Sequence, residues 1–146
     1  MTKTNKSSSI QVLQTVAWIN KQGFRAVPTH AQSKAAINRD YVALDYKSPP
    51  EDLWKRHDYG VGIVTGPRHH GPVDADLDCD EALFFAPLFF PSTPAVFGRP
   101  SKPRSHMLYR VDSPEFEKRS FLDPVSNDTI IEIRGDQGHQ TIAPGS

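Results

Sequence analysis

Residues 71–79 carry the pattern that most restricts what this chain can fold into, because apolar and acidic side chains alternate there without a break. Four small or apolar residues alternate with three aspartates: Val73, Ala75, Leu77 and Cys79 with Asp74, Asp76 and Asp78. Successive side chains of a strand point to opposite faces, so the pattern predicts a half-buried strand with one carboxylate face. Neighbouring aspartates on that face lie roughly 7 Å apart, from a rise of ~3.3 Å per residue. They repel one another unless a cation or solvent neutralises them.

Two interpretations of these aspartates remain open. They can form the solvated face of an exposed edge strand. Alternatively, they bind a hard divalent cation, since Mg²⁺ and Mn²⁺ prefer oxygen ligands and keep coordination positions open for phosphate. Two such ions about 3.5–4 Å apart can hold the attacking and leaving oxygens of a phosphoryl transfer. An Asp-x-Asp pair alone is weak evidence, because several unrelated metal enzymes contain one.

A loop rich in Gly, Pro and Ser over residues 98–104 contains three basic side chains, Arg99, Lys102 and Arg104. No acidic residue lies between 98 and 111. Basic groups on a loop stiffened by proline suit the capture of a polyphosphate, although a solvated turn explains the bases equally well. Ser105 and His106 follow where the loop meets the next predicted strand. A lone histidine is more often structural, but this one lies beside a basic loop.

Glu132 is the only acid in the β-branched run 130–133. A charge within a buried strand needs a partner. Either Glu132 lies at a sheet edge and pairs with Arg134, or it is a third metal ligand that approaches the aspartates from a neighbouring strand.

The other patterns predict a mixture of helices and strands with no regular βαβ repeat. We expect helices from residue 10 to Gly23, after Pro50, and over 81–90, and a loop with one helical turn over 29–48. The predicted strands cover residues 24–27, 61–65, 71–79, 95–97, 106–111, 130–133 and, at an edge, 141–143. This order favours an α+β domain of two layers with a largely antiparallel mixed sheet.

Composition excludes several classes of protein. The 146 residues fit one domain, 17 basic residues balance 17 acidic ones, and the single cysteine permits no internal disulfide and no cysteine-based zinc site. Residues 1–9 are polar and lack the apolar segment of a signal peptide, so we expect a disordered leader. No apolar run is long enough to span a membrane. We therefore expect a cytoplasmic protein without membrane partners.

Together, the three motifs resemble the prim-pol branch of the archaeo-eukaryotic primase superfamily, as found in plasmid and phage replication proteins. That family has a strand ending in Asp-x-Asp, a histidine that begins a strand after a small-residue loop, and a third acid on another strand. The corresponding segments are 71–78, 97–109 and 131–138. Residues 23–28, 60–66 and 143–146 resemble its opening and its closing turn. The resemblance implies an RRM-like catalytic core over residues 10–146, as the N-terminal part of a longer protein.

The resemblance also implies an activity: a DNA primase/polymerase that joins nucleoside triphosphates (NTPs or dNTPs) on single-stranded DNA. In that family the Asp-x-Asp pair falls five and seven residues after the glycine that starts the strand. The resemblance therefore implies Asp76 and Asp78, with Glu132, as ligands of two Mg²⁺ or Mn²⁺ ions, and Asp74 remains a possible ligand. The implied catalytic residues are Asp76, Asp78, His106 and Glu132. The implied nucleotide-binding residues are Arg99, Lys102, Arg104, Ser105, His106 and Arg134. A helicase domain of the same longer chain is a further expected partner.

Two other classes of function remain as alternatives. A Mn²⁺-dependent glycosyltransferase also uses an Asp-x-Asp pair, but it leaves Glu132 and the basic loop without roles. A non-catalytic nucleic-acid-binding module would be expected to expose aromatic side chains on its sheet, where this sequence has acids.

Overall fold

The computed structural model of the chain describes residues 6–31, 33–56 and 58–144. Its elements, in chain order, are α1 (Lys6–Lys21), β1 (Ala26–His30), the 3₁₀ turn η1 (Asp40–Val42), α2 (Glu51–Arg56), β2 (Tyr59–Val64), the 3₁₀ turn η2 (Pro67–His69), β3 (Val73–Leu77), α3 (Asp80–Phe89), β4 (Val96–Arg99), β5 (Lys102–Tyr109), β6 (Arg119–Leu122), β7 (Thr129–Arg134) and β8 (Gln140–Ile142). Residues 6–9 extend α1 rather than forming a leader, and residues 1–5 of the predicted leader lie outside the described residues. Within the described residues, no helix has the length and apolar character needed to cross a membrane.

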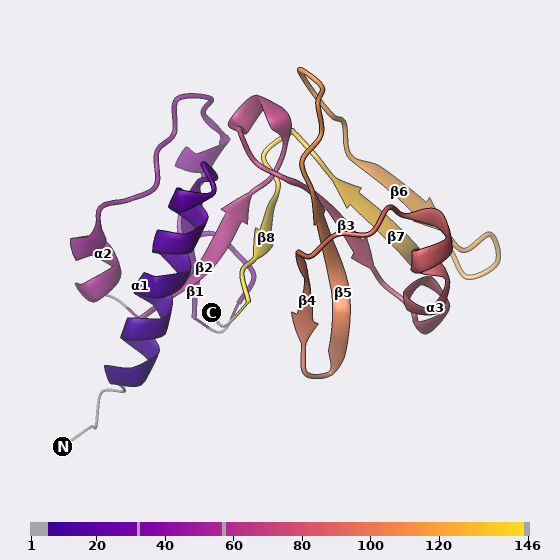
Figure 1. The fold of residues 1–146 in the computed structure, drawn as a ribbon, viewed down its shortest axis with the longest axis horizontal. Coiled ribbons are helices and arrows are strands. Elements are labelled where there is room, and N and C mark those ends of the chain that lie inside the picture. The colour runs from indigo at the N-terminus through magenta and orange to yellow at the C-terminus, as the bar shows by residue number, and fades with distance from the viewer. Residues whose placement is uncertain (1–5, 32, 57, 145–146) are drawn as a thin grey trace.

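The strands form two antiparallel sheets, which confirms the predicted α+β class but divides the expected single sheet (Figure 1). The first sheet has the order β1-β2-β8, and the second has the order β4-β5-β3-β7-β6. The chain passes from one sheet to the other through η2, where Gly66 has a φ of 98°. A Cβ at Gly66 would collide with the side chain and backbone of Asp136, so this close approach requires glycine.

Two apolar clusters lie under the helices, and the one under α1 and α2 extends into the second sheet through Leu108 of β5. Residues of α1 and α2 pack on the first sheet, and the cluster includes Ile19, Trp54 and Ile63. On the second sheet, Ala82 and Ala86 of α3 pack over the apolar face of β3. Figure 1 shows α1 and α2 at one end of the molecule and α3 at the other. The helices therefore cover the apolar faces and leave the acidic face of β3 turned toward the first sheet.

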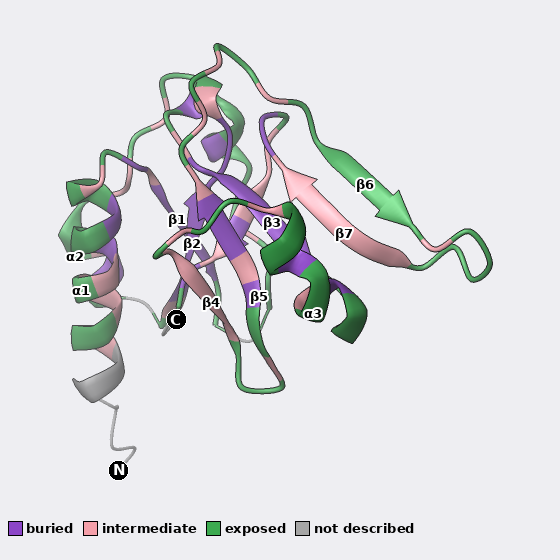
Figure 2. Cartoon of the chain, turned by 45° about the vertical axis from the view of Figure 1, so that its right-hand side comes forward, coloured by how far each residue is buried: buried purple, intermediate pink, exposed green. Residues whose placement is uncertain are grey.

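Strand β3 is buried on both faces, so the prediction of a half-buried strand is wrong (Figure 2). Asp74 is 0% exposed and Asp76 is 5% exposed, whereas Asp78, just beyond the strand, is exposed. The position of β3 in the fold explains why its acidic face is buried. β3 is the central strand of its sheet, and β8 of the first sheet covers its acidic face, where Thr141 comes within 3.4 Å of His106.

The predicted basic loop is instead a bulged hairpin between β4 and β5. Phe97 pairs with His106 but Arg99 pairs with Lys102, so β5 has extra residues at this point. Arg104 has a φ of 63°, in the left-handed region, as expected within a bulge. A Cβ on Gly98, opposite the bulge, would collide with the backbone of β5. This hairpin holds the basic side chains on a strand framework.

Candidate active site

The register of β3 with its two neighbours gathers the predicted site residues on one face. Asp76 lies opposite His106 of β5 and opposite Glu132 of β7. Asp74 lies opposite Arg134 of β7. Directly opposite residues of antiparallel strands share a face and have neighbouring Cβ atoms. Residues far apart in the chain therefore form one polar row across the sheet.

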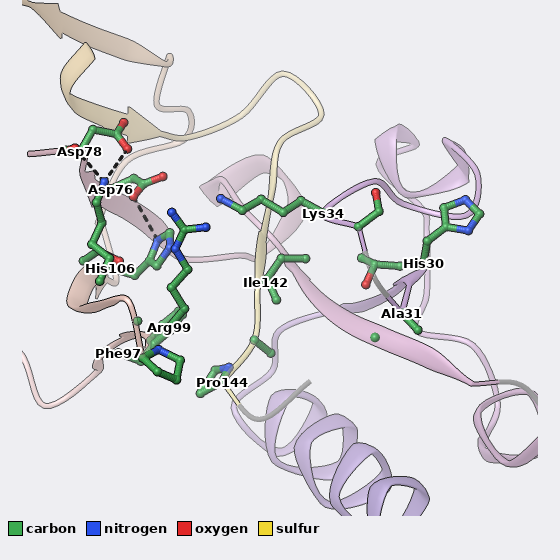
Figure 3. Close-up of a pocket in the computed structure, with 18 residues that line it drawn as sticks. His30, Ala31, Lys34, Asp76, Asp78, Phe97, Arg99, His106, Ile142 and Pro144 are labelled. Carbon is green, nitrogen blue, oxygen red and sulfur yellow. Dashed lines mark hydrogen bonds and ion pairs between the residues drawn. The ribbon is translucent and has the colours of Figure 1, made fainter. Parts of the chain in front are cut away.

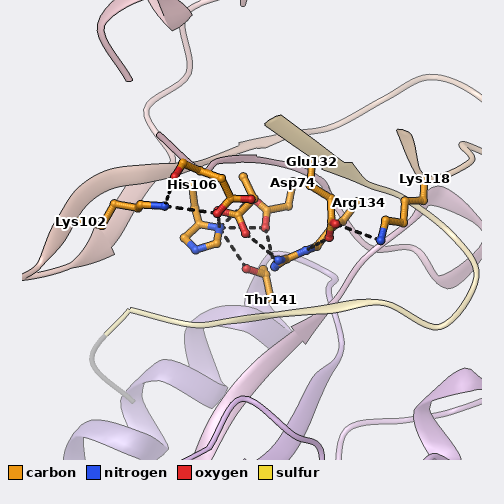
Figure 4. A network of polar contacts seen from close by, with 9 residues as sticks. Asp74, Lys102, His106, Lys118, Glu132, Arg134 and Thr141 are labelled. Carbon is orange, nitrogen blue, oxygen red and sulfur yellow. Dashed lines mark hydrogen bonds and ion pairs between the residues drawn. The ribbon is translucent and has the colours of Figure 1, made fainter. Parts of the chain in front are cut away.

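A guanidinium partly neutralises the acids of this row (Figure 4). Nη2 of Arg134 lies 2.6 Å from Oδ2 of Asp76, and Nε lies 2.8 Å from Oε1 of Glu132. Nη1 of the same side chain is 3.7 Å from Oδ2 of Asp74. Nζ of Lys118 lies 2.9 Å from the other Glu132 oxygen, Oε2. The pair between Glu132 and Arg134, one of two alternatives from the sequence, is thus present.

The pKa values of Asp76 and Glu132 are shifted in opposite directions. Burial raises the pKa of the Asp76 carboxyl above its ordinary value, although the nearby charges of His106 and Arg134 oppose that rise. Burial by itself would also raise the pKa of Glu132. Hydrogen bonds from Arg134 and Lys118 outweigh it, so the pKa of Glu132 lies below its ordinary value. Asp76 therefore gives up its proton less readily than a solvated aspartate.

The imidazole of His106 is held by several side chains, one of which is Asp76, whose Oδ1 lies 3.7 Å from Nδ1. Its Nδ1 lies 3.0 Å from Oδ2 and 3.3 Å from Oδ1 of Asp74. The hydroxyl oxygen of Thr141 is 3.4 Å from the same nitrogen. The ring of Phe97 stacks on the imidazole with a centroid distance of 5.1 Å and an interplanar angle of 19°. Only 14% of the His106 side chain is exposed.

A cavity of about 450 Å³ opens between the β4–β5 hairpin and the first sheet (Figure 3). Six predicted site residues line it: Asp76, Asp78, Arg99, Lys102, Ser105 and His106. Arg104 is exposed and, like Glu132 and Arg134, is not among the described residues that line the cavity. Glu132 and Arg134 lie on β7, and Arg134 contacts the cavity lining through its ion pair with Asp76.

The opposite wall of the cavity was not predicted from the sequence. His30 ends β1, and Lys34 follows in the connection after it; both line the cavity. Nε2 of Gln140 in β8 donates a hydrogen bond of 2.5 Å to the Lys34 carbonyl, which ties this connection to the first sheet. Segment 29–48 has weak periodicity, so only its basic side chains could have suggested a role. The contacts of Phe97, Lys118 and Thr141 were not predicted either, because they depend on the tertiary arrangement of the strands.

The predicted metal ligands fit a divalent cation in part. Asp76 and Asp78 offer carboxylate oxygens, the donors that Mg²⁺ and Mn²⁺ prefer, to the same cavity. Asp78 accepts from Nζ of Lys102 at 3.3 Å, and 35% of its side chain is exposed. Both oxygens of Glu132 are occupied by Arg134 and Lys118. Accordingly, the described residues contain no group of three His, Cys, Asp or Glu side chains arranged to hold a metal ion.

The family model described as bifunctional DNA primase/polymerase, N-terminal, matches residues 16–146. Comparison with curated proteins and with solved structures finds no match. The matched region includes every strand of both sheets and every predicted site residue.

Proposed function

The chain belongs to the bifunctional DNA primase/polymerase family, and from that premise we propose that it joins nucleotides on a single-stranded DNA template. The observation that carries the proposal is the composition of the cavity beside β3. Carboxylates of Asp76 and Asp78 face it together with the basic side chains of Arg99 and Lys102. Adjacent acidic and basic groups suit a substrate that brings both a triphosphate and divalent cations.

The basic side chains would bind the triphosphate from both walls of the cavity. Arg99 and Lys102 approach from the hairpin, and Lys34 approaches from the first sheet. Lys102 donates to the Asp78 backbone carbonyl at 2.7 Å and to its carboxylate at 3.3 Å. An incoming phosphate would compete for that ammonium group. As an imidazolium, His106 would donate from Nε2 to a phosphate oxygen, with Asp74 balancing its charge.

Asp76 and Asp78 would hold the divalent cations on the floor of the cavity. Bound Mg²⁺ or Mn²⁺ would lower the pKa of the attacking hydroxyl and neutralise charge on the triphosphate. Burial, which raises the pKa of Asp76, would be offset by a cation at its carboxylate. Glu132 would act from behind, by holding Arg134 and thereby the carboxylate of Asp76 in place. It can become a ligand only when Arg134 and Lys118 release it.

The test is a nucleotide incorporation assay on the full chain. Labelled nucleoside triphosphates, Mn²⁺ and a single-stranded DNA template are supplied, with and without a primer. We expect template-dependent products, and a loss of at least roughly 100-fold in Asp78→Asn, because a ligand to the cation is removed. Asp112→Asn, which removes an exposed carboxylate away from the cavity, should retain wild-type activity.

Other outcomes of this assay would overturn the proposal. Template binding without incorporation would favour a non-catalytic nucleic-acid-binding module. Transfer from a nucleotide sugar, offered in a parallel reaction, would favour the glycosyltransferase. Incorporation that survives in Asp78→Asn at the wild-type rate would show that the cavity is not the active site.

A further inference from the structure

Asp74 is a buried acid that would act on the proposed reaction only through His106. Its side chain is 0% exposed, and it is not among the described residues that line the cavity. A cation or phosphate in the cavity therefore meets Asp76 and His106, whereas Asp74 lies behind them. Its closest polar partner is Nδ1 of His106 at 3.0 Å, and Nη1 of Arg134 lies 3.7 Å away. A charge held this far from solvent requires such partners.

The contact with Asp74 decides which ring nitrogen of His106 carries the proton. An ionised carboxylate only accepts hydrogen bonds, so the nitrogen that faces it must donate. A neutral imidazole has a single N–H, and at Nδ1 that hydrogen lies between His106 and Asp74. Nε2 is then the ring nitrogen left for the cavity, which His106 lines. The stacked ring of Phe97 restricts rotation that would exchange the two nitrogens.

We propose that Asp74 is a positioning residue, which fixes the proton of His106 on Nδ1 and presents Nε2 to the cavity (Figure 4). The use of Nε2 toward a nucleotide rests on the proposed function, but the tautomer itself does not. In the sequence, Asp74 was a possible metal ligand. Its complete burial and its contact with His106 assign it a different task, which explains why this strand carries three alternating aspartates.

Ring-nitrogen NMR of the full ¹⁵N-labelled chain tests the proposal without a nucleotide. Long-range ¹H–¹⁵N spectra are recorded above the pH at which imidazoles are neutral, and the His106 signals are assigned by their loss in His106→Gln. We expect Nδ1 to be the protonated nitrogen and Nε2 the unprotonated one. A His106 ring with its proton on Nε2 in the wild-type protein would overturn the proposal.

Two variants separate the effect of Asp74 from that of its neighbour Thr141. In Asp74→Asn the side-chain amide can donate to Nδ1, so we expect the proton to move to Nε2. In Thr141→Val the wild-type tautomer should persist, because the Thr141 hydroxyl makes only the longer contact of 3.4 Å. A switch in Thr141→Val would contradict the proposal even if Asp74→Asn failed to fold. Asp112→Asn serves as the control for loss of a surface charge.

The consequence for binding is measured separately. In Asp74→Asn, the imidazolium that would donate to phosphate loses the carboxylate that balances its charge. We therefore expect the affinity for a nucleoside triphosphate to fall about tenfold, while the affinity for Mn²⁺ alone stays within a factor of about two. A fall in Mn²⁺ affinity with an unchanged tautomer would restore Asp74 as a metal ligand. If nucleotides do not bind even to the wild-type chain, the proposed function fails, whereas the NMR result still decides the role of Asp74.

Discussion

Nη2 of Arg134 lies 2.6 Å from Oδ2 of Asp76, so a cation of the protein itself already occupies one side of the carboxylate that we propose as a metal ligand. The arrangement answers a problem visible in the sequence, where three aspartates on one strand face repel one another. Partial neutralisation by Arg134 allows the acids to be buried before any ion binds. A divalent cation at Asp76 must therefore compete with, or displace, the guanidinium.

Replacing Arg134 should destabilise the metal-free protein and favour cation binding. Arg134→Gln leaves buried acids without their counter-charge, so we expect a loss of about 3 kcal/mol, or a melting temperature lower by roughly 6–12 °C. The affinity for Mn²⁺ should rise about tenfold, since the competing charge is gone. Calorimetry and thermal melts measure both quantities. Arg119→Gln, at an exposed position of β6, is the control. Unchanged Mn²⁺ affinity in Arg134→Gln would show that the guanidinium does not compete.

Asp76 should cost the metal-free protein stability at neutral pH. Folding buries Asp76 and raises its pKa. Its contribution to the free energy of unfolding is therefore fully present below the pKa of the unfolded state, and it is lost as pH rises through the higher pKa of the folded state. In Asp76→Asn, the amide oxygen still accepts from Arg134. We expect an unfolding free energy at pH 7 equal to or above that of the wild type, and a difference that narrows in acid. Denaturant titrations at several pH values measure it, and a loss above about 2 kcal/mol at pH 7 would contradict the account.

Local sequence patterns predicted β3 and the shared face of Asp74, Asp76 and Asp78, because side-chain alternation is a property of the strand alone. The burial of β3 on both faces could not be predicted from this alternation. It depends on β5 and β7, which flank β3, and on β8, which places Thr141 over the acidic face. The apolar residues of β3 pack under α3 and gave no sign that the acids would be buried as well.

There are physical reasons why the sequence patterns did not predict β6, the β4–β5 hairpin and the ion pair between Asp76 and Arg134. Every residue of β6 is exposed, so no alternation of apolar and polar residues reveals an edge strand that is specified by pairing with β7. The β4–β5 hairpin contains Gly98 and Pro100, residues that typically indicate a loop. The two strands nevertheless pair on both sides of the bulge, so the hairpin continues through this segment. The Asp76–Arg134 ion pair joins residues 58 positions apart. Its prediction would have required the register of β3 with β7.

Glu132 should stabilise the fold in a pH-dependent manner opposite to that of Asp76. Hydrogen bonds from Arg134 and Lys118 outweigh burial and hold the pKa of Glu132 below its ordinary value. Its contribution to the free energy of unfolding is therefore present above the pKa of the unfolded state, and it is lost as pH falls through the pKa of the folded state. Glu132→Gln should cost about 1–2 kcal/mol at pH 7, an amount reduced by partial solvent exposure. Urea unfolding at pH 7 and near pH 3 measures the difference. An equal loss at both pH values would indicate a packing effect instead.

His106 should contribute to nucleotide affinity and not to cation affinity. Its ring lines the cavity beside the hairpin, whereas the carboxylates of Asp76 and Asp78 remain intact when the ring is removed. A hydrogen bond to a charged phosphate is worth about 1.5–3 kcal/mol, so His106→Ala should weaken nucleoside triphosphate binding roughly 10- to 100-fold. Fluorescence titration with a labelled nucleotide measures this loss, and calorimetry with Mn²⁺ alone should give the wild-type affinity within a factor of about two.

The competing account makes His106 a structural residue, because its ring stacks on Phe97 and its Nδ1 contacts a fully buried acid. Under that account, His106→Ala fails to fold or loses several kcal/mol of unfolding free energy. His106→Gln stays folded, because its amide can donate a hydrogen bond to Asp74. Circular dichroism of both variants separates the two roles. A folded His106→Gln that still binds nucleotide as tightly as the wild type would contradict direct contact with the phosphate. A folded His106→Gln with weakened nucleotide binding and unchanged Mn²⁺ binding would support direct contact. Glutamine can replace the imidazole as a donor to Asp74, but it lacks the imidazole nitrogen that faces the cavity.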